Sequence, residues 1–448
     1  MNKTKIIVLD DDPTGSQTVH SCLLLTQWDP TTLREAIMDS APIFFVLTNT
    51  RAMDPTNAAR VTREVCHNVR VVLDTLEQVG VTINPIFVSR SDSTLRGHYP
   101  VETDVMAQEL GPFDAHFLTP AFFEGGRITR GSIHYLRVGE RWVPVHETEF
   151  ARDSLFAYHH SYLPDYVAEK TAGRIPAHKV QRFSLDDIYS ETLSDRLLAL
   201  SGNTCCVFDA EQQEDLNRFA EEVRIAARRG KRFLFRSAAS LLTSLARLPA
   251  QPVAAVDMGR WVRNGAPGVV IVGSHVAKTT AQLQRLLQQP GIQGIEIDVA
   301  TMPEGNTTLL NGAMAQISAA HHDGLTAVVY TSRVERQFPT AAERVLFGEQ
   351  VSALLMDIER SLPVTIGFLI SKGGITSNDT LSTGLKLRTA RLLGQILPGV
   401  SVVRCPVDHP RYPDLPVVIF PGNVGDENAL ATAYQRLSTH SATIQMAP

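Results

Sequence analysis

The stretch Pro85-Ile86-Phe87-Val88-Ser89-Arg90-Ser91-Asp92-Ser93-Thr94-Leu95-Arg96-Gly97 changes from apolar to polar within a few residues. Its first four residues predict a buried strand, and a helical pattern follows at 99–110. The polar part should therefore lie at a strand's carboxyl end, where open α/β sheets bind ligands. Its two arginines, one carboxylate and four hydroxyls suit a small, oxygen-rich anion. The alternative is a polar turn with a helix cap, because helix N-termini select Ser, Asp and Thr.

Three more apolar runs in the first half of the chain end in polar groups. The runs cover 6–9, 43–47 and 116–118, and helical patterns alternate with them, as in parallel βαβ units. The polar segments that follow are Asp10-Asp11-Asp12-Pro13-Thr14-Gly15, Thr48-Asn49-Thr50-Arg51 and Pro120–Arg127. Four such ends on one sheet predict a single lined cleft. The three aspartates could bind Mg²⁺, accept a hydroxyl proton or hold sugar hydroxyls, or they could cap a helix at Asp12 or Thr14.

Composition narrows the class of protein. The chain has 448 residues, which favours two domains, and 42 Lys plus Arg stand against 47 Asp plus Glu, so we expect no nucleic-acid partner. The five cysteines have no paired spacing, which fits reduced thiols in a cytosol. No run of roughly 18 apolar residues predicts a membrane span, and Met1–Lys5 leads straight into the first strand without a signal segment. We expect a cytoplasmic protein without a membrane partner.

A second α/β pattern begins after a segment rich in proline and glycine. We predict a first domain at 1–247, a linker at 248–267 and a second domain at 268–448, with a cleft between two largely parallel sheets flanked by helices. Three glycine turns follow predicted strands in the second domain: Gly273-Ser274, Ser371-Lys372-Gly373-Gly374-Ile375-Thr376 and Pro421-Gly422-Asn423-Val424-Gly425. Glycine lets backbone N–H groups approach a phosphate, so the turns suit a nucleotide triphosphate, although none is a Walker A or dinucleotide fingerprint. Tight turns without a ligand are the alternative.

Taken in order, the motifs resemble the four-carbon acid sugar kinases, a family formerly known as a domain of unknown function. The resemblance rests on the motifs Asp11-Asp12-x-Thr14-Gly15, Arg51, Asp92-Ser93-Thr94-Leu95-Arg96-Gly97, Pro120-Ala121-Phe122 with Gly126-Arg127, Glu147-Thr148 and the three glycine turns. It covers nearly the whole chain. The chain departs from the family pattern at Ser89-Arg90, where members often have two lysines.

The resemblance implies an ATP-dependent kinase for threonate, erythronate or 3-oxo-tetronate, with Mg²⁺ as the companion of ATP. A homodimer is a possible assembly, and no protein side chain is assigned as a metal ligand. The acid-sugar side would comprise Asp11, Asp12, Arg51, Arg90, Asp92, Ser93, Thr94 and Arg96. The ATP side would comprise Ser274, Gly373, Gly374, Ile375, Thr376, Gly422 and Asn423.

The expected chemistry is phosphoryl transfer from ATP to a hydroxyl of a short sugar acid, which depends on positioning and charge neutralisation. We expect Arg51, Arg90 or Arg96 to bind the substrate carboxylate, with Arg96 among the catalytic residues. Asp11 or Asp92 is the expected base, and the sequence does not separate them. Two other classes remain: a sugar-acid dehydrogenase or isomerase, disfavoured by the missing glycine fingerprint after the first strand, and a non-catalytic sugar-acid sensor.

Overall fold

The computed structural model describes residues 3–304, 306–333, 338–422 and 424–445. The chain forms two compact units, Met1–Pro249 and Ala250–Pro448. The boundary between them lies inside the segment 248–267. The rest of that segment is compact, because it forms the 3₁₀ helices η6 (Ala255–Trp261) and η7 (Arg263–Gly265), with Met258 fully buried.

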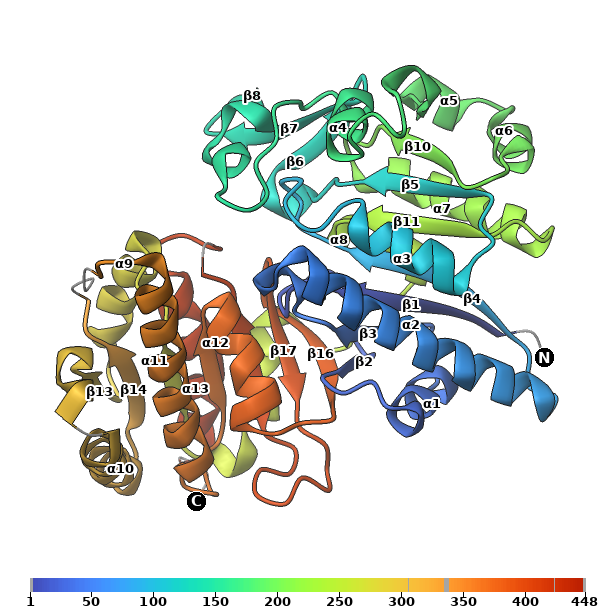
Figure 1. The fold of residues 1–448 in the computed structure, drawn as a ribbon. Helices are drawn as coiled ribbons and strands as arrows, with labels where there is room; N and C mark the ends of the chain where they lie inside the picture. The colour runs from blue at the N-terminus through green and yellow to red at the C-terminus, as the bar shows by residue number, and fades with distance from the viewer. Residues whose placement is uncertain (1–2, 305, 334–337, 423, 446–448) are drawn as a thin grey trace. The chain divides into compact units, whose positions relative to one another are not determined.

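The first unit is built on a sheet whose paired strands are all parallel (Figure 1). The order is β2-β3-β1-β4-β11-β5-β10-β9. The bounds are β1 Lys3–Asp10, β2 Leu23–Leu25, β3 Ile43–Leu47, β4 Ile83–Arg90, β5 Ala115–Thr119, β9 Gln181–Phe183, β10 Thr204–Phe208 and β11 Phe233–Ser237. The four apolar runs singled out in the sequence are thus strands β1, β3, β4 and β5, and three of these are adjacent.

Helices cover both faces of this sheet. On one face, α2 (Pro55–Gln78) and α3 (Val101–Leu110) lie side by side, and the apolar stripe of α2 packs with Phe44 and Phe87 of the strands. Asp54 caps α2 by accepting hydrogen bonds from two backbone N–H groups of its first turn. On the other face, Phe219 of α7 (Gln213–Arg228) packs against rings of β5, β10 and β11.

The remaining helices of the first unit are shorter. They are α1 (Pro30–Met38), α4 (Leu163–Lys170), α5 (Leu185–Tyr189), α6 (Leu193–Ala199) and α8 (Ala239–Ala246). A separate antiparallel sheet, β6-β7-β8, follows β5. Its strands are Arg127–Arg130, Ile133–Val138 and Arg141–Pro144.

The second unit has the strand order β13-β14-β12-β15-β18-β17-β16, parallel up to β18 and antiparallel beyond it. The strands are β12 Val269–Val272, β13 Ile292–Ile297, β14 Thr326–Thr331, β15 Leu369–Lys372, β16 Thr389–Leu397, β17 Val400–Arg404 and β18 Pro416–Phe420. The helices are α9 Ala277–Leu287, α10 Asn306–His322, α11 Ala341–Ser361, α12 Gly374–Asp379 and α13 Ala429–Gln445. Both units therefore confirm the predicted α/β class with largely parallel sheets flanked by helices.

Several strands differ from the sequence prediction. The apolar pattern at 364–370 predicts a strand there, but the strand begins at Leu369, because the residues before it form a turn, and it extends to Lys372. The short strands β2 and β9 were missed. Strand β16 was also missed, and a register irregularity beside Gly394 interrupts its pattern.

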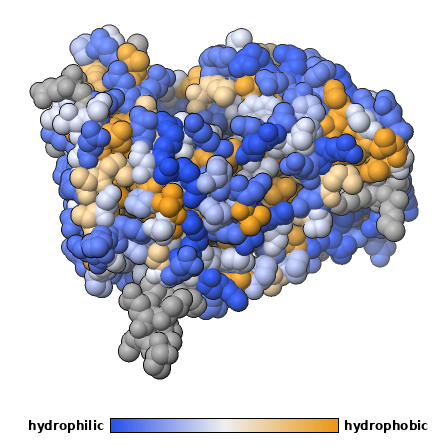
Figure 2. Space-filling model, turned by 90° about the horizontal axis from the view of Figure 1, so that it is seen from below, coloured by the Kyte–Doolittle hydropathy of each residue, from blue (hydrophilic) through white to orange (hydrophobic). Residues whose placement is uncertain are grey.

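The surface carries few large apolar groups on the face drawn in Figure 2. This face is mostly hydrophilic, with hydrophobic residues in small separate groups, as expected when strand and helix side chains pack inside each unit. Among the residues described, no helix is long and apolar enough to cross a membrane.

Candidate active site

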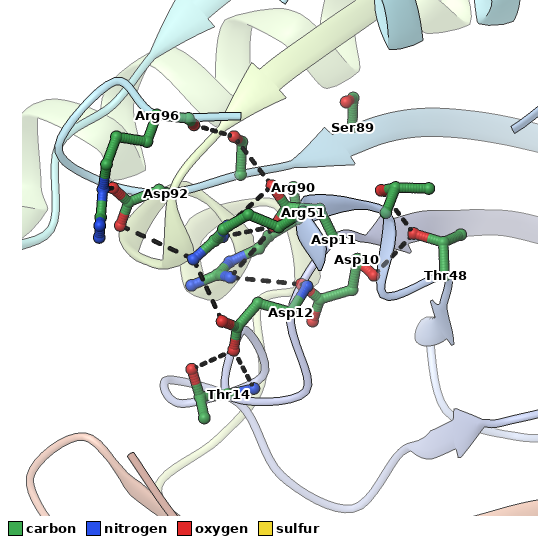
Figure 3. A network of polar contacts seen from close by, with 12 residues as sticks. Asp10, Asp11, Asp12, Thr14, Thr48, Arg51, Ser89, Arg90, Asp92 and Arg96 are labelled. Carbon is green, nitrogen blue, oxygen red and sulfur yellow. Dashed lines mark hydrogen bonds and ion pairs between the residues drawn. The ribbon is translucent and has the colours of Figure 1, made fainter. Parts of the chain in front are cut away.

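A dense polar network lies at the carboxyl ends of β1, β3 and β4 in the first unit (Figure 3). Strands β3 and β4 both pair with β1 in parallel, so the polar segments that follow the three strands meet at one edge. The sequence prediction that these ends lie together is correct for Asp11, Asp12, Arg51, Arg90 and Asp92.

Arg51 connects three aspartates. Its Nε and Nη2 atoms lie 3.2 and 2.5 Å from the two carboxylate oxygens of Asp11, and its Nη1 atom lies 3.2 Å from Asp12 Oδ2. Nη1 is also 3.9 Å from Asp92 Oδ1, on the loop after β4 (Figure 3). Burial would raise the pKa of Asp12, but Arg51 and Arg90 outweigh burial and hold that pKa below its ordinary value. The guanidinium therefore joins loops from two strands.

Asp10 lies beneath this network. It is fully buried, and its Oδ1 atom is 3.3 Å from Arg90 Nη1. Burial raises the pKa of Asp10 to about 7, opposed by Arg90 and reinforced by Asp11. A Cβ atom on Gly15 would lie 2.1 Å from Asp10 Oδ1, so only glycine lets the turn close over this carboxylate. Asp10 is therefore covered by the chain, and of its two acidic neighbours Asp11 is also buried, while Asp12 has 21% of its side chain exposed.

The loop after β4 carries the second part of the site. Asp92 Oδ2 accepts hydrogen bonds from Thr94 Oγ1 and from Arg96 Nε, the latter at 2.8 Å. Burial would raise the pKa of Asp92, but Arg51, Arg96 and Thr94 together hold it below its ordinary value. Ser93 is buried in the same loop. Asp92 is thus an ionised acceptor, with 13% of its side chain exposed.

The sequence prediction missed a buried pair behind this loop. Arg236, at the end of β11, donates to Glu102 of α3 and, at 2.7 Å, to Ser89 Oγ. Glu102 also accepts from Thr50 Oγ1 at 2.6 Å, so the pair joins the segment after β3 to the end of strand β4. The sequence did contain a signal for Arg236, because Arg236-Ser237 follows an apolar run and so forms a fifth polar strand end.

In the second unit, the three glycine turns meet at the ends of neighbouring strands. Strand β15 pairs with both β12 and β18, which places Gly273-Ser274, Gly373-Gly374 and Pro421-Gly422 together. A Cβ atom on Gly273 would lie 2.4 Å from Thr376 Oγ1, and one on Gly422 would lie 3.7 Å from Ser274 Oγ. The turns are therefore in close contact.

A cavity of about 430 Å³ opens beside these turns. Its polar wall is formed by Gly273, Ser274, Gly373, Gly374 and Thr376, with Ile375 at the same wall and 70% exposed. The apolar wall includes Val299, Phe338, Phe347, Val351 and Leu355. Gly422 lies beside Ser274 but is not among the residues that line the cavity, and Asn423 lies outside the described residues. The volume and the mixed lining are typical of a small-molecule site.

Two cations support the turns and were also missed. Lys372 is fully buried, and its Nζ atom donates to the carbonyls of Pro421 and Gly422, the latter at 3.2 Å. Burial lowers the pKa of Lys372 to about 7, with Lys278 adding to the decrease. Arg333, after β14, donates to the Ser274 carbonyl at 2.9 and 3.0 Å. Lys372 belongs to a glycine turn quoted from the sequence, and Arg333 follows an apolar run, but the sequence does not show which carbonyls they bond.

Within the described ranges, no group of three or more His, Cys, Asp or Glu side chains could hold a metal ion. The carboxylates of the network in the first unit instead form ion pairs with arginines. Mg²⁺ is commonly bound by one or two protein groups together with substrate phosphates. The residues present therefore fit an ion that arrives with a nucleotide and do not form a protein cage for one.

Comparison with protein families defines the class. Residues 6–245 match a sugar-binding N-terminal domain, and residues 269–430 match a nucleotide-binding C-terminal domain. The chain therefore belongs to the four-carbon acid sugar kinase family, in which these two domains occur in this order.

Two curated relatives have named activities. A D-erythronate kinase of Heliobacterium modesticaldum is 29% identical over 226 residues, which cover 48% of this chain and 47% of that protein. A D-threonate kinase of Bordetella bronchiseptica is 24% identical over 414 residues, which cover 90% of this chain and 88% of that protein.

Two solved structures share the fold. One is a protein of Salmonella typhimurium LT2 provisionally described as a tRNA synthase, with a TM-score of 0.68, 19% identity and coverage of 96% of this chain and 99% of that one. The other is a Haemophilus influenzae protein of the DUF1537 family, with a TM-score of 0.64, 18% identity and coverage of 96% and 100%. At these identities the likeness concerns the fold alone.

Proposed function

We propose that the protein is an ATP-dependent kinase that phosphorylates a hydroxyl of a four-carbon sugar acid. The observation that carries the proposal is the cavity of about 430 Å³ beside three glycine turns, in the part of the chain that matches a nucleotide-binding domain. The family membership and the two kinase relatives support the same activity. A sugar-acid sensor would not need this cavity, and the aspartates after β1 stand where a dehydrogenase would carry its glycine fingerprint.

In this proposal the glycine turns bind the phosphates of ATP. The backbone N–H groups of Gly374 and Ile375 can approach the phosphates closely, because Gly373 and Gly374 present no side chain there, while the Gly373 N–H donates to the Phe420 carbonyl at 2.8 Å. The apolar wall with Phe338, Phe347 and Leu355 suits the base. Mg²⁺, when bound with ATP, would neutralise phosphate charge.

In the first unit, Asp92 is the residue we assign to the reacting hydroxyl. Asp11 is 1% exposed and is bonded by Arg51 and Ser91. Asp92 Oδ1, among the described contacts, has only the 3.9 Å approach of Arg51 and can accept a hydrogen bond from the substrate. The hydroxyl proton would pass to Asp92 as the hydroxyl oxygen bonds to the γ-phosphorus and ADP leaves. Arg51, Arg90 and Arg96 fix the aspartates and offer N–H groups to the substrate carboxylate.

The test is a panel of threonate, erythronate and 3-oxo-tetronate stereoisomers with ATP and Mg²⁺, followed by ADP release and by mass spectrometry of the product. We expect at least one acid to gain one phosphoryl group, and the neutral four-carbon polyol to be a poor substrate. Absence of turnover with every acid, combined with thermal stabilisation by the acids but not by ATP, would instead support the sensor.

A further inference from the structure

The loop that carries Asp92 and Arg96 is held by its backbone carbonyls. Three consecutive carbonyls each accept a hydrogen bond from a side chain outside the loop. The donors are His134 Nε2 to the Ser93 carbonyl at 2.7 Å, Tyr158 Oη to the Thr94 carbonyl at 2.7 Å and Tyr166 Oη to the Leu95 carbonyl at 2.9 Å. The next carbonyl, that of Arg96, accepts from Ser91 within the loop at 2.9 Å. The whole turn is thus fixed at each peptide unit.

The three donors come from one segment of the chain and are buried. His134 lies on β7, Tyr166 on α4 and Tyr158 between them, and their exposed fractions are 0%, 2% and 2%. They have few alternative conformations, because Tyr158 and Tyr166 pack edge to face in the same apolar cluster. Rigid donors of this kind restrict the loop more than a hydrogen bond from a solvent-exposed side chain would.

His134 is fixed as a neutral donor. Its Nε2 atom must carry the proton, since it faces a carbonyl oxygen, and its Nδ1 atom accepts from Thr129 Oγ1 at 3.0 Å. Burial lowers the pKa of His134 to about 4, which keeps the ring neutral near pH 7. Thr129 is itself fully buried. The orientation of the imidazole is therefore determined at both nitrogens.

The loop needs this support because its backbone is strained. Leu95 has a φ angle of +66°, in the left-handed region that residues other than glycine, asparagine and aspartate seldom adopt. Such a conformation persists only when its surroundings fix it. Leu95 is buried and lies between Asp92 and Arg96, so a relaxed loop would move both side chains.

The same segment also contacts the Arg96 side chain. The guanidinium lies over the Phe150 ring at 4.9 Å from its centroid, and Nη1 is 3.5 Å from Asp153 Oδ2. Backbone and side chain of the loop are thus both held by residues that follow strand β5. Asp92 and Arg96, which would act on the substrate, therefore lie on one segment of the chain, and the residues that hold them lie on another.

We propose that His134, Tyr158 and Tyr166 are positioning residues for the acid-sugar loop, which keep Asp92 and Arg96 in the geometry needed for sugar-acid binding and phosphorylation. The inference rests on the proposed kinase function. It assigns no contact with substrate to the three residues. Their effect should therefore appear in the kinetics of the sugar acid and not in those of ATP, whose cavity is formed by the second unit.

The test compares the full-length parent with the double variant Tyr158→Phe/Tyr166→Phe, which removes two hydroxyls and leaves both rings. We expect kcat/KM for the sugar acid to fall at least tenfold and the KM for ATP to change less than twofold. Tyr99→Phe is the matched control, because Tyr99 belongs to the same cluster and its hydroxyl lies near His116 and Cys205, away from the loop carbonyls. The control should keep both parameters within twofold of the parent.

A second pair of variants tests the histidine. His134→Gln retains an N–H donor near the Nε2 position and should keep kcat/KM for the sugar acid within about threefold. His134→Leu should lose activity as the double tyrosine variant does. If His134→Leu does not fold, the tyrosine variants decide the matter. Parent-like sugar-acid kinetics in the double variant, or a loss equal to that of Tyr99→Phe, would overturn the proposal.

The experiment also separates this inference from the proposed function. If the parent phosphorylates none of the acids, the proposed function fails, and hydrogen exchange of the peptide that contains residues 91–97 replaces the kinetics. Exchange should then be faster in the double variant than in the parent or in Tyr99→Phe. Equal exchange in all three proteins would show that the hydroxyls do not hold the loop.

Discussion

Replacing Arg51 with lysine tests the central ion-pair network. The guanidinium makes three hydrogen bonds to Asp11 and Asp12, from three different nitrogens. A lysine ammonium keeps the charge but is a single point that can contact one carboxylate well. Arg51→Lys therefore removes about two charge-assisted hydrogen bonds while Asp11, 1% exposed, stays buried.

The expected loss of stability follows from these contacts. Each charge-assisted hydrogen bond contributes roughly 1.5–3 kcal/mol, and we take the low end because 18% of the Arg51 side chain is exposed. The free energy of unfolding of the first unit should fall by about 3 kcal/mol, and its Tm should fall by roughly 6–12 °C. Because the loops that bear Asp11 and Asp92 separate, the KM for the sugar acid should rise about tenfold or more.

Differential scanning calorimetry and steady-state kinetics measure both effects. Arg60→Lys is the control for the same substitution, since Arg60 pairs with Glu64 on the exposed surface of α2 at 3.6 Å. A surface pair of this kind contributes only about 0.3–0.5 kcal/mol, so the control should shift the Tm by at most about 2 °C. A parent-like Tm and KM in Arg51→Lys would refute the view that its three hydrogen bonds organise the site.

Three further changes address other parts of the chain. Asp92→Asn removes the acceptor for the hydroxyl proton, so kcat should fall about 100-fold or more with an unchanged KM for ATP; turnover at the parent rate would exclude Asp92 as base. Gly273→Ala places a Cβ atom 2.4 Å from Thr376 Oγ1 and should raise the KM for ATP while leaving that for the sugar acid unchanged; calorimetric titration with ATP provides the check. Glu359 is fully buried, and burial raises its pKa to about 8. Since the folded-state pKa lies above the unfolded value near 4.5, its stabilising effect is complete below pH 4.5 and is lost as the pH rises towards 8. Between pH 5.5 and 7.5 the parent should lose roughly 2–3 kcal/mol more than Glu359→Gln in urea unfolding; equal slopes would contradict the assignment.

The fold could be predicted because buried parallel strands are nearly continuous apolar runs. The run 43–47 coincides with β3, and the valine stripe of α2 is buried as its helical spacing predicts. Strand β16 escaped prediction because half-buried and buried positions alternate irregularly where a bulge shifts its register beside Gly394. Local sequence also places the start of β15 too early, because the apolar residues before Leu369 form a turn.

The candidate site could be predicted only in part, for a physical reason. Parallel topology brings strand ends together whatever their sequence, so the meeting of Asp11, Arg51 and Asp92 follows from the strand pattern alone. Which atoms pair depends on side-chain packing between segments far apart in the chain. Arg236 and Lys372 continue apolar runs, and their partners come from other elements of the fold. The position of these residues at strand ends is visible in the sequence, but their partners are not.

The pairing changes the expected role of the arginines. From sequence, Arg51, Arg90 and Arg96 suggest cations that await a substrate carboxylate, but each already contacts at least one aspartate. Burial raises the pKa of Asp10 to about 7, so near neutral pH Asp10 carries only part of a charge, and the negative charges of the four aspartates equal or slightly exceed the positive charges of the three arginines. A sugar acid would then gain little from net charge and must be recognised by directed hydrogen bonds. Positioning of these side chains therefore matters more than their number, which is why a loop fixed at three carbonyls is suited to this site.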